Sequence, residues 1–89
     1  MQIDQDCRQD VTTRLRRVQG QIAGIIAMID EGRDCTDVVT QISAASKGLD
    51  RAGMRVVVDG IQQCAAATGR GDEPPMDVAR LERLFLSLS

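Results

Sequence analysis

Two amphipathic patterns separated by a glycine occupy RLRRVQGQIAGIIAMIDEGRDCTDVVTQISAASKGLDRAG, residues 14–53. Ahead of the glycine, apolar residues recur every three or four positions, which is the spacing of one helix face. They are Val11, Leu15, Val18, Ile22, Ile25, Ile26 and Ile29. Gly32 ends this pattern, and Asp34 or Thr36 can cap the helix that follows. The spacing predicts a helix over about 9–31 and places Cys35 at the start of the next helix.

The second pattern is unusually long and predicts a helix over about 36–67. Its apolar side is formed by Val38, Val39, Ile42, Ala45, Leu49, Val56, Val57, Ile61 and Cys64. Gly48, Gly53 and Gly60 interrupt the pattern, and each glycine costs roughly 1 kcal/mol relative to alanine inside a helix. These glycines indicate either close contact with a neighbouring helix or, at Gly53, a break.

A third helix is expected after TGRGDEPP, residues 68–75, where Gly and Pro mark a loop. Helical spacing resumes over about 76–88, at Val78, Leu81, Leu84, Phe85 and Leu88. Phe85 is the only aromatic residue, and such an aliphatic composition is typical of packed helices. We therefore predict an all-α fold, a three-helix protomer with a long second helix, as a single domain over residues 1–89. A chain this short buries only about 60–65% of its extended surface, so partner subunits are expected to add core.

Cys35 and Cys64 lie twenty-nine positions apart on the predicted second helix. At about 100° per residue they fall within about 20° of the same helix face. At ~1.5 Å per residue they are about 43 Å apart, whereas a disulfide needs α-carbons within ~6 Å. They can therefore cooperate only between subunits. Two copies of the helix packed antiparallel, crossing near Leu49 and Asp50, would bring Cys35 of one chain beside Cys64 of the other.

The three cysteines differ in their sequence surroundings. Cys35 lies near a helix N-terminus, where unpaired backbone N–H groups favour a thiolate, although the carboxylates of Asp34 and Asp37 oppose that effect. Cys64, taken alone, resembles a core residue, and an inert buried thiol is the alternative for Cys35 as well. Cys7 lies in the polar N-terminal segment and is predicted to be a free surface thiol or a supplementary ligand.

The donor inventory favours sulfur chemistry over a metal. The chain contains no His, so Cys35 and Cys64 of a second copy give only two soft ligands. Cu(I) tolerates two thiolates, whereas a closed zinc site needs two further donors. Dithiol redox chemistry needs only the pair. We therefore expect no cofactor, with Cu(I) at Cys35 and Cys64 as the alternative. Without a conventional acid–base constellation, the chain is not expected to be an enzyme.

Basic residues gather on one side of the predicted helices, although the net charge is −2 and the pI about 4.9. Lys47, Arg51 and Arg55 fall on the side of the second helix opposite the cysteines. The first helix adds Arg14, Arg16 and Arg17. This balance excludes nucleic-acid binding by bulk attraction, so any DNA binding must depend on clustering. The alternative is a solvated face with local ion pairs, such as Arg55 with Asp59.

The N-terminal sequence MQIDQDCRQD is polar and acidic, unlike a signal peptide. No apolar run approaches the ~20 residues of a membrane span. We expect a cytoplasmic protein without membrane contact, in a compartment where three cysteines do not form a structural disulfide framework.

The quoted stretch, followed by Cys64, resembles the CsoR/RcnR family of small all-helical bacterial repressors over nearly the whole chain. The matching motifs are Arg-Leu at 14–15, Gln-Gly-Gln at 19–21, Asp-Cys at 34–35 and Gln-Ile-Ser-Ala at 41–44. The resemblance implies an antiparallel dimer forming a four-helix bundle, a dimer-of-dimers tetramer, and operator DNA that is released when an inducer binds between subunits. The family's DNA-facing arginines match Arg14 and Arg51, with Arg16, Arg17, Lys47 and Arg55 as neighbours.

In the family's copper sensors a Cys, His, Cys set holds the metal, and here the His position falls at Gly60. Two cysteines without the His resemble the persulfide-sensing, CstR-like branch, in which sulfane sulfur links the pair between subunits. That resemblance assigns attack to Cys35 and resolution to Cys64. We predict a DNA-binding repressor that responds to persulfide, polysulfide or oxidant. The alternatives are a Cu(I)-sensing repressor with an incomplete ligand set, and a helical thiol carrier or interaction module without DNA binding.

Overall fold

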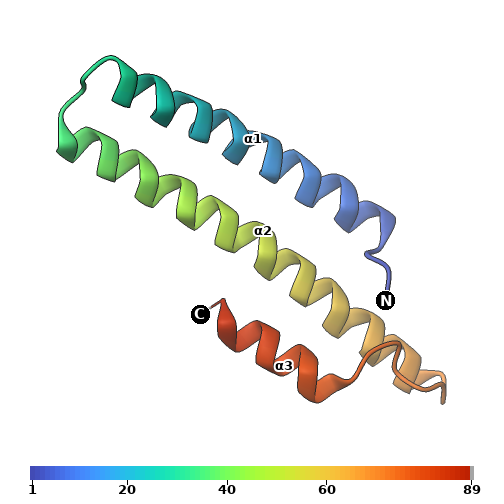
Figure 1. Cartoon of the computed structure of the whole chain (residues 1–89). Coiled ribbons are helices and arrows are strands. Elements are labelled where there is room, and N and C mark those ends of the chain that lie inside the picture. The colour runs from blue at the N-terminus through green and yellow to red at the C-terminus, as the bar shows by residue number, and fades with distance from the viewer. Residues whose placement is uncertain (89) are drawn as a thin grey trace.

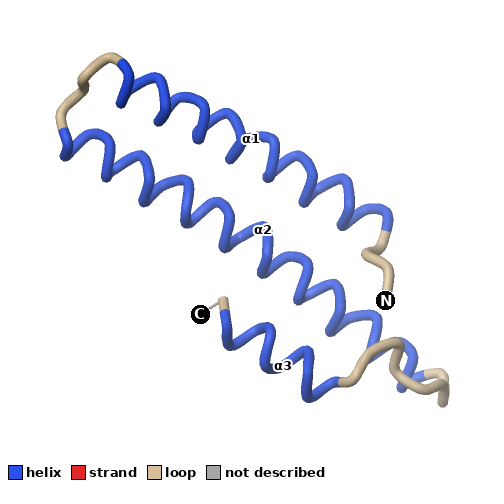
Figure 2. The backbone as a smooth tube through the Cα atoms, in the orientation of Figure 1, coloured by secondary structure: helices blue, strands red, loops and turns tan. Residues whose placement is uncertain are grey.

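The computed structural model describes residues 1–88, which form three helices. Helices α1 (Gln5–Asp30) and α2 (Cys35–Gly69) form an antiparallel hairpin, and α3 (Val78–Ser87) folds back along the C-terminal half of α2 (Figure 1). The connections are short, and helix dominates the trace (Figure 2). Helices α1 and α3 each pack on α2 and not on each other. The molecule is elongated, 58 × 24 × 13 Å, and the all-α, three-helix prediction is confirmed for the described residues.

Each helix begins at an aspartate cap. Asp4, Asp34 and Asp77 accept hydrogen bonds from the backbone N–H two residues on, which satisfies donors that the first helical turn leaves unpaired. Asp34 is one of the two caps predicted for the second helix. The first helix begins at Gln5 rather than near residue 9, because Asp4 caps it earlier than the apolar pattern indicates.

Glycines end the first two helices. Gly32 and Gly71 have φ angles of 72° and 79°, in the left-handed region that glycine adopts without steric cost. Beyond Gly32, the Arg33 N–H donates to the Met28 carbonyl at 3.0 Å, and the Gly32 N–H donates to the Ile29 carbonyl at 3.1 Å. This paired pattern is a Schellman motif, and it turns the chain sharply into α2.

Helix α2 is continuous over 35 residues, so the chain does not break at Gly53. Gly48 and Gly53 are instead points of close contact. A Cβ atom at Gly48 would lie 3.0 Å from Val18 Cγ2 of α1, and one at Gly53 would lie 3.2 Å from Leu88 Cδ1. A Cβ atom at either position would therefore require the neighbouring side chain to shift. The close-contact interpretation of these glycines is confirmed.

The core consists of three small clusters along α2. Two join α1 to α2 and one joins α3 to α2. Their buried members are Cys7, Val11 and Ala52; Val18, Ile25 and Ala45; and Val57, Cys64 and Leu81. Because the layer is only one helix deep on each side of α2, much of the predicted apolar pattern stays exposed.

The hairpin exposes a set of apolar side chains from both helices, here called the apolar face. Its members are 40–58% exposed: Leu15, Ile22, Ile26, Ile29, Val39, Ile42 and Leu49. Two adjoining hollows share Ile22 and Leu49, which shows that residues of α1 and α2 meet on this side. Monomeric proteins rarely expose apolar patches of this kind, which usually mark interaction surfaces. Among the described residues, no helix has the length and hydropathy needed to cross a membrane.

Candidate functional site

Cys35 is the first residue of α2 and its thiol is exposed. The Asp34 carboxylate accepts a hydrogen bond from the Thr36 N–H at 3.0 Å, which orders the turn that presents the cysteine. Arg33 pairs with Asp37 at 3.5 Å across the same turn. Cys35 thus stands at an ordered, polar, solvent-accessible helix start, where a thiol can meet a reagent from solution.

Cys64 lies at the other end of α2 and is only 5% exposed. It packs in one cluster with Val57 and Leu81, and its Sγ lies 4.0 Å from the Met76 carbonyl oxygen. The cover over this thiol is formed by α3 and by Met76 in the loop before it. One continuous helix separates Cys64 from Cys35, so the two thiols cannot meet within one chain.

In the copper sensors of the family that the sequence resembles, a histidine occupies the position of Gly60. Gly60 is buried, one helical turn before Cys64. A Cβ atom at Gly60 would lie 3.0 Å from Met1 Cε and 3.1 Å from Leu81 Cδ1. An imidazole would therefore displace both neighbours. Among the described residues, no group of three or more His, Cys, Asp or Glu side chains could hold a metal ion. The residues of one chain do not fit a three-donor copper site.

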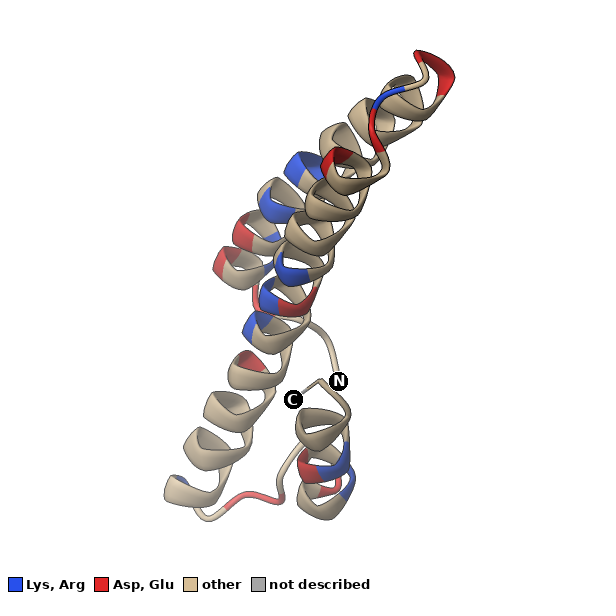
Figure 3. Ribbon diagram, turned by 90° about the vertical axis from the view of Figure 1, so that its left-hand side faces the viewer, with Lys and Arg blue, Asp and Glu red and all other residues tan. Residues whose placement is uncertain are grey.

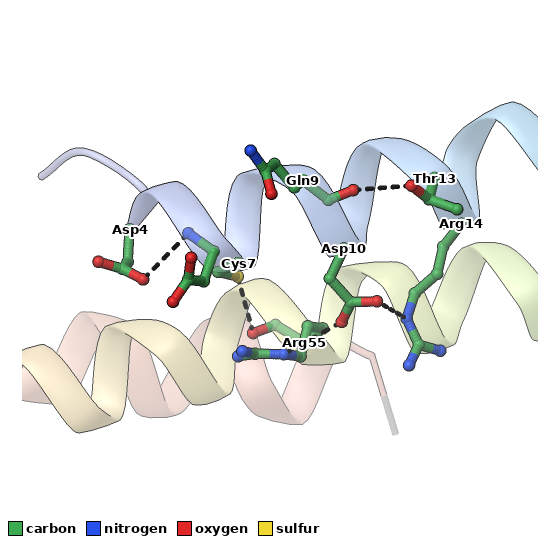
Figure 4. Close-up of polar contacts among 8 residues, drawn as sticks. Asp4, Cys7, Gln9, Asp10, Thr13, Arg14 and Arg55 are labelled. Atoms are coloured by element: carbon green, nitrogen blue, oxygen red, sulfur yellow. Dashed lines mark hydrogen bonds and ion pairs between the residues drawn. The ribbon is translucent and has the colours of Figure 1, made fainter.

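Cys7 is not the free surface thiol that its polar surroundings predicted. It lies on α1, is 0% exposed, and packs against Val11 and Ala52. Its thiol donates a hydrogen bond to the Arg55 carbonyl at 3.6 Å (Figure 4). Burial raises the pKa of Cys7, nearby carboxylates raise it further, and only Arg55 opposes them. The early start of α1 puts Cys7 on the face of Val11, a four-residue spacing that already marked it as core.

Four cations predicted to contact DNA line one groove between α1 and α2, of about 330 Å³. They are Arg14, Arg17, Lys47 and Arg51, and we call this the basic groove. Lys and Arg gather along the middle of the hairpin (Figure 3). Gln21 also lines the groove, and its Oε1 is buried without a hydrogen-bond partner. Several guanidinium groups in one concave site suit an anion such as a phosphate, which they can bind through paired donors.

The other two predicted cations are placed differently. Arg55 adjoins Arg14 and Arg51 in a neighbouring hollow. Arg16 lies beside Leu15 and Leu49 in a hollow of the apolar face, away from the basic groove. The pattern of arginines alone did not separate these two surfaces.

Asp10 pairs with two arginines on the basic side of the hairpin. This residue was not identified from the sequence. Its carboxylate accepts from Arg14 Nε at 3.1 Å and pairs with Arg55 Nε at 3.3 Å (Figure 4). It thereby ties α1 to α2. The expected local pair of Arg55 with Asp59 is wrong. Asp59 is 4% exposed and accepts from the Asp4 N–H and Gln63 Nε2, at 3.1 and 2.8 Å. The four-residue spacing of Asp10 and Arg14 was the available signal.

Comparison with known proteins agrees with this arrangement. A family model described as metal-sensitive transcriptional repressor matches residues 7–86. The copper-sensing transcriptional repressor RicR of Mycobacterium tuberculosis (strain ATCC 25618 / H37Rv) is 34% identical over 85 residues, covering 85% of this chain and 88% of that protein. The copper-sensing transcriptional repressor CsoR of Bacillus subtilis (strain 168) is 27% identical over 78 residues, covering 88% and 77%. No solved structure matches significantly. The chain belongs to the family of metal-sensitive transcriptional repressors.

Proposed function

We propose that this chain is a cytoplasmic operator-binding repressor whose inducer acts on Cys35 of one subunit and Cys64 of another. The inducer is sulfane sulfur, as persulfide or polysulfide, or an oxidant. One observation carries the choice: position 60 is a glycine packed against Met1 and Leu81, so it supplies no third donor beside the two thiols. A pair of thiols is sufficient for sulfur chemistry.

The apolar face supports assembly by antiparallel pairing. Leu49 is 52% exposed near the midpoint of α2, and Ile22 and Ile42 flank it on the same side. A second copy that crosses near Leu49 and Asp50 would cover these side chains and form a four-helix bundle, and two such dimers would form the tetramer. The same crossing would bring Cys35 of one subunit toward the Cys64 end of the other.

The sulfur reaction balances with the donor alone. The Cys35 thiolate attacks the outer sulfur of a persulfide R–S–SH; the donor S–S bond breaks, Cys35 becomes a persulfide, and R–SH is released. The Cys64 thiolate of the second subunit then attacks the Cys35 sulfur. A disulfide forms between the subunits and hydrogen sulfide leaves. Two thiols are oxidised and the donor persulfide is reduced to thiol and sulfide.

The basic groove is the proposed DNA contact, with Arg16 and Arg55 as neighbours. Replacing Arg51 with Ala removes a cation from the groove and should weaken binding to a fluorescent promoter fragment. The slope of log affinity against log salt should become shallower by about 1 for each phosphate that the variant no longer neutralises. Arg70, which pairs with Asp72 outside the groove, provides the control. If Arg70→Ala weakens binding as much as Arg51→Ala, the groove is not the DNA contact. A thiol carrier would show no salt-dependent DNA binding.

Cu(I) is the second candidate inducer, because the relatives described above are named as copper-sensing. Cys35 and Cys64 of a second subunit are the thiolates that would hold it, and thiolates are ligands that Cu(I) prefers. The two inducers are separated by adding tetrasulfide or stoichiometric Cu(I) to the reduced protein bound to labelled promoter DNA. Release by tetrasulfide, with a covalent dimer in the intact-mass spectrum, supports the sulfur proposal. Release by Cu(I) alone, without covalent change, supports the copper alternative and contradicts ours.

A further inference from the structure

The two thiols of the proposed switch differ sharply in access. Cys35 is exposed at the start of α2, whereas Cys64 is 5% exposed. The residues over Cys64 come from α3 and its approach: Leu81 is buried in the same cluster, and Met76 and Leu88 pack against that cluster. A thiol must be reachable at bonding distance to form a disulfide, near 2.05 Å between sulfurs. Cys64 is therefore out of reach while α3 is docked.

Among the helices, α3 contacts α2 alone, through a small number of side chains. Helix α3 has ten residues, fewer than the ~12–15 that an isolated helix needs to be stable in water. Its anchors Leu81 and Leu88 lie against Gly60 and Gly53, where Cβ atoms would be 3.1 and 3.2 Å away. Leu84, in the same helix, is 45% exposed. An element held by a few contacts to one neighbour opens at a lower free energy than the hairpin.

Helix α3 covers one half of a surface whose other half is open. Along α2, Ile42 and Leu49 face within about 40° of Gly53, and Gly60 and Cys64 within about 20° of it. Ile42 and Leu49 are 48% and 52% exposed, while the stretch around Gly60 and Cys64 lies under α3. In the proposed assembly, a second subunit that pairs Cys35 with Cys64 would approach the position that α3 occupies. Docked α3 and the subunit link therefore compete for one surface.

We propose that α3 is a removable cover that controls the order of the two sulfur steps. Sulfur is accepted at Cys35 first, and Cys64 resolves the persulfide only when α3 undocks. The completed link then holds α3 away from α2, so the position of α3 reports the oxidation state. The order of the sulfur steps rests on the proposed function. The protection of Cys64 by α3 can be measured without inducer or DNA.

The test is alkylation of the reduced protein by N-ethylmaleimide, followed by intact-mass and peptide mass spectrometry over time. We expect Cys35 to react fast and Cys64 slowly. Leu81→Ala weakens the docked state by removing a buried side chain and should speed Cys64 labelling roughly tenfold or more, leaving Cys35 unchanged. Leu84→Ala removes the same side chain from a position that is 45% exposed in the same helix; it is the matched control and should change neither rate.

Hydrogen exchange supplies a second measurement that does not depend on a variant. If undocking of α3 limits access, the protection of Cys64 against alkylation should equal the protection of the α3 backbone amides. Equal labelling of Cys35 and Cys64 in the wild type, or equal effects of Leu81→Ala and Leu84→Ala, would overturn the cover. If the cover is found but tetrasulfide never links Cys35 to Cys64 in Leu81→Ala, the proposed function fails and the gating of the thiol stands.

Discussion

Three cysteines that look alike in the sequence occupy three different environments. Cys35 is exposed at a capped helix start, Cys64 lies under α3, and Cys7 is fully buried between α1 and α2. Reactivity of a thiol follows its access and the fraction present as thiolate. Cys35 is therefore the residue that a reagent meets first. Cys7, whose pKa is raised by burial, is a packing residue.

The raised pKa of Cys7 predicts a pH dependence of stability. Folding keeps this thiol protonated, so its contribution is fully present below the ordinary thiol pKa and is lost as the pH rises through the folded-state pKa. The free energy of unfolding of the wild type should fall above about pH 8.5, where the unfolded thiol ionises. Cys7→Ala should lessen this fall, as measured by urea unfolding in reductant at neutral and alkaline pH. An unchanged slope in Cys7→Ala would contradict the assignment.

At the level of the helix, the glycines of α2 let two neighbours approach closely. Gly48 meets the β-branched, buried Val18 of α1, and Gly60 meets Leu81 of α3. Valine has few alternative rotamers and cannot move aside easily. These contacts fix the positions of α1 and α3 along α2 and so place the basic groove and the cover over Cys64.

Substitution of Gly48 by Ala should therefore destabilise the protein although alanine favours helices. Overpacking against Val18 is expected to cost about 1–3 kcal/mol, which exceeds the gain of up to ~1 kcal/mol in helix propensity. Gly20, with nothing within 4 Å of its Cβ position, is the matched control. Gly20→Ala should raise the free energy of unfolding by up to about 1 kcal/mol. Thermal and urea unfolding compare the two; stabilisation by both variants would show that Gly48 is not a contact.

Local signals in the sequence predicted the positions of the helices better than the contacts between them. Apolar spacing and the Asp34 cap gave the three helices and the start of α2 within a few residues. Helical angles also put Lys47 and Arg51 on one side of α2. The burial of Cys7, the bridge from Asp10 to Arg55 and the cover over Cys64 were not predicted, because each depends on which helices meet in space. Such contacts join residues far apart in the chain, and periodicity does not encode them.

On the scale of the whole molecule, the hairpin presents an apolar face and a separate basic groove. The apolar face includes Leu49 and Ile42, whereas Arg51 and Lys47 line the groove. Each surface can therefore meet a different partner, a second subunit or DNA. In the proposed assembly, a change in how the subunits pair would alter the spacing between the basic grooves. This is the physical link proposed between the thiols and operator release.

The apolar face predicts how assembly can be disrupted. Leu49→Asp puts a charge at its centre, where burial of an unpaired carboxylate opposes association. We expect monomers or weak dimers by sedimentation at concentrations where the wild type is a dimer or tetramer. Val58, 36% exposed beside Arg14 and Arg55, is the control, and Val58→Asp should keep the assembly. An unchanged sedimentation coefficient for Leu49→Asp would place the subunit interface elsewhere.

Mixed subunits can show whether a sulfur link joins Cys35 and Cys64 of different chains. Cys35→Ala and Cys64→Ala are prepared separately, mixed under conditions that exchange subunits, treated with tetrasulfide and measured by intact mass with peptide mapping. We predict no Cys35–Cys64 link in either variant alone and one link in the mixture, joining Cys64 of the first variant to Cys35 of the second. A covalent dimer from Cys64→Ala alone at the same yield, or no link in the mixture, would contradict this claim.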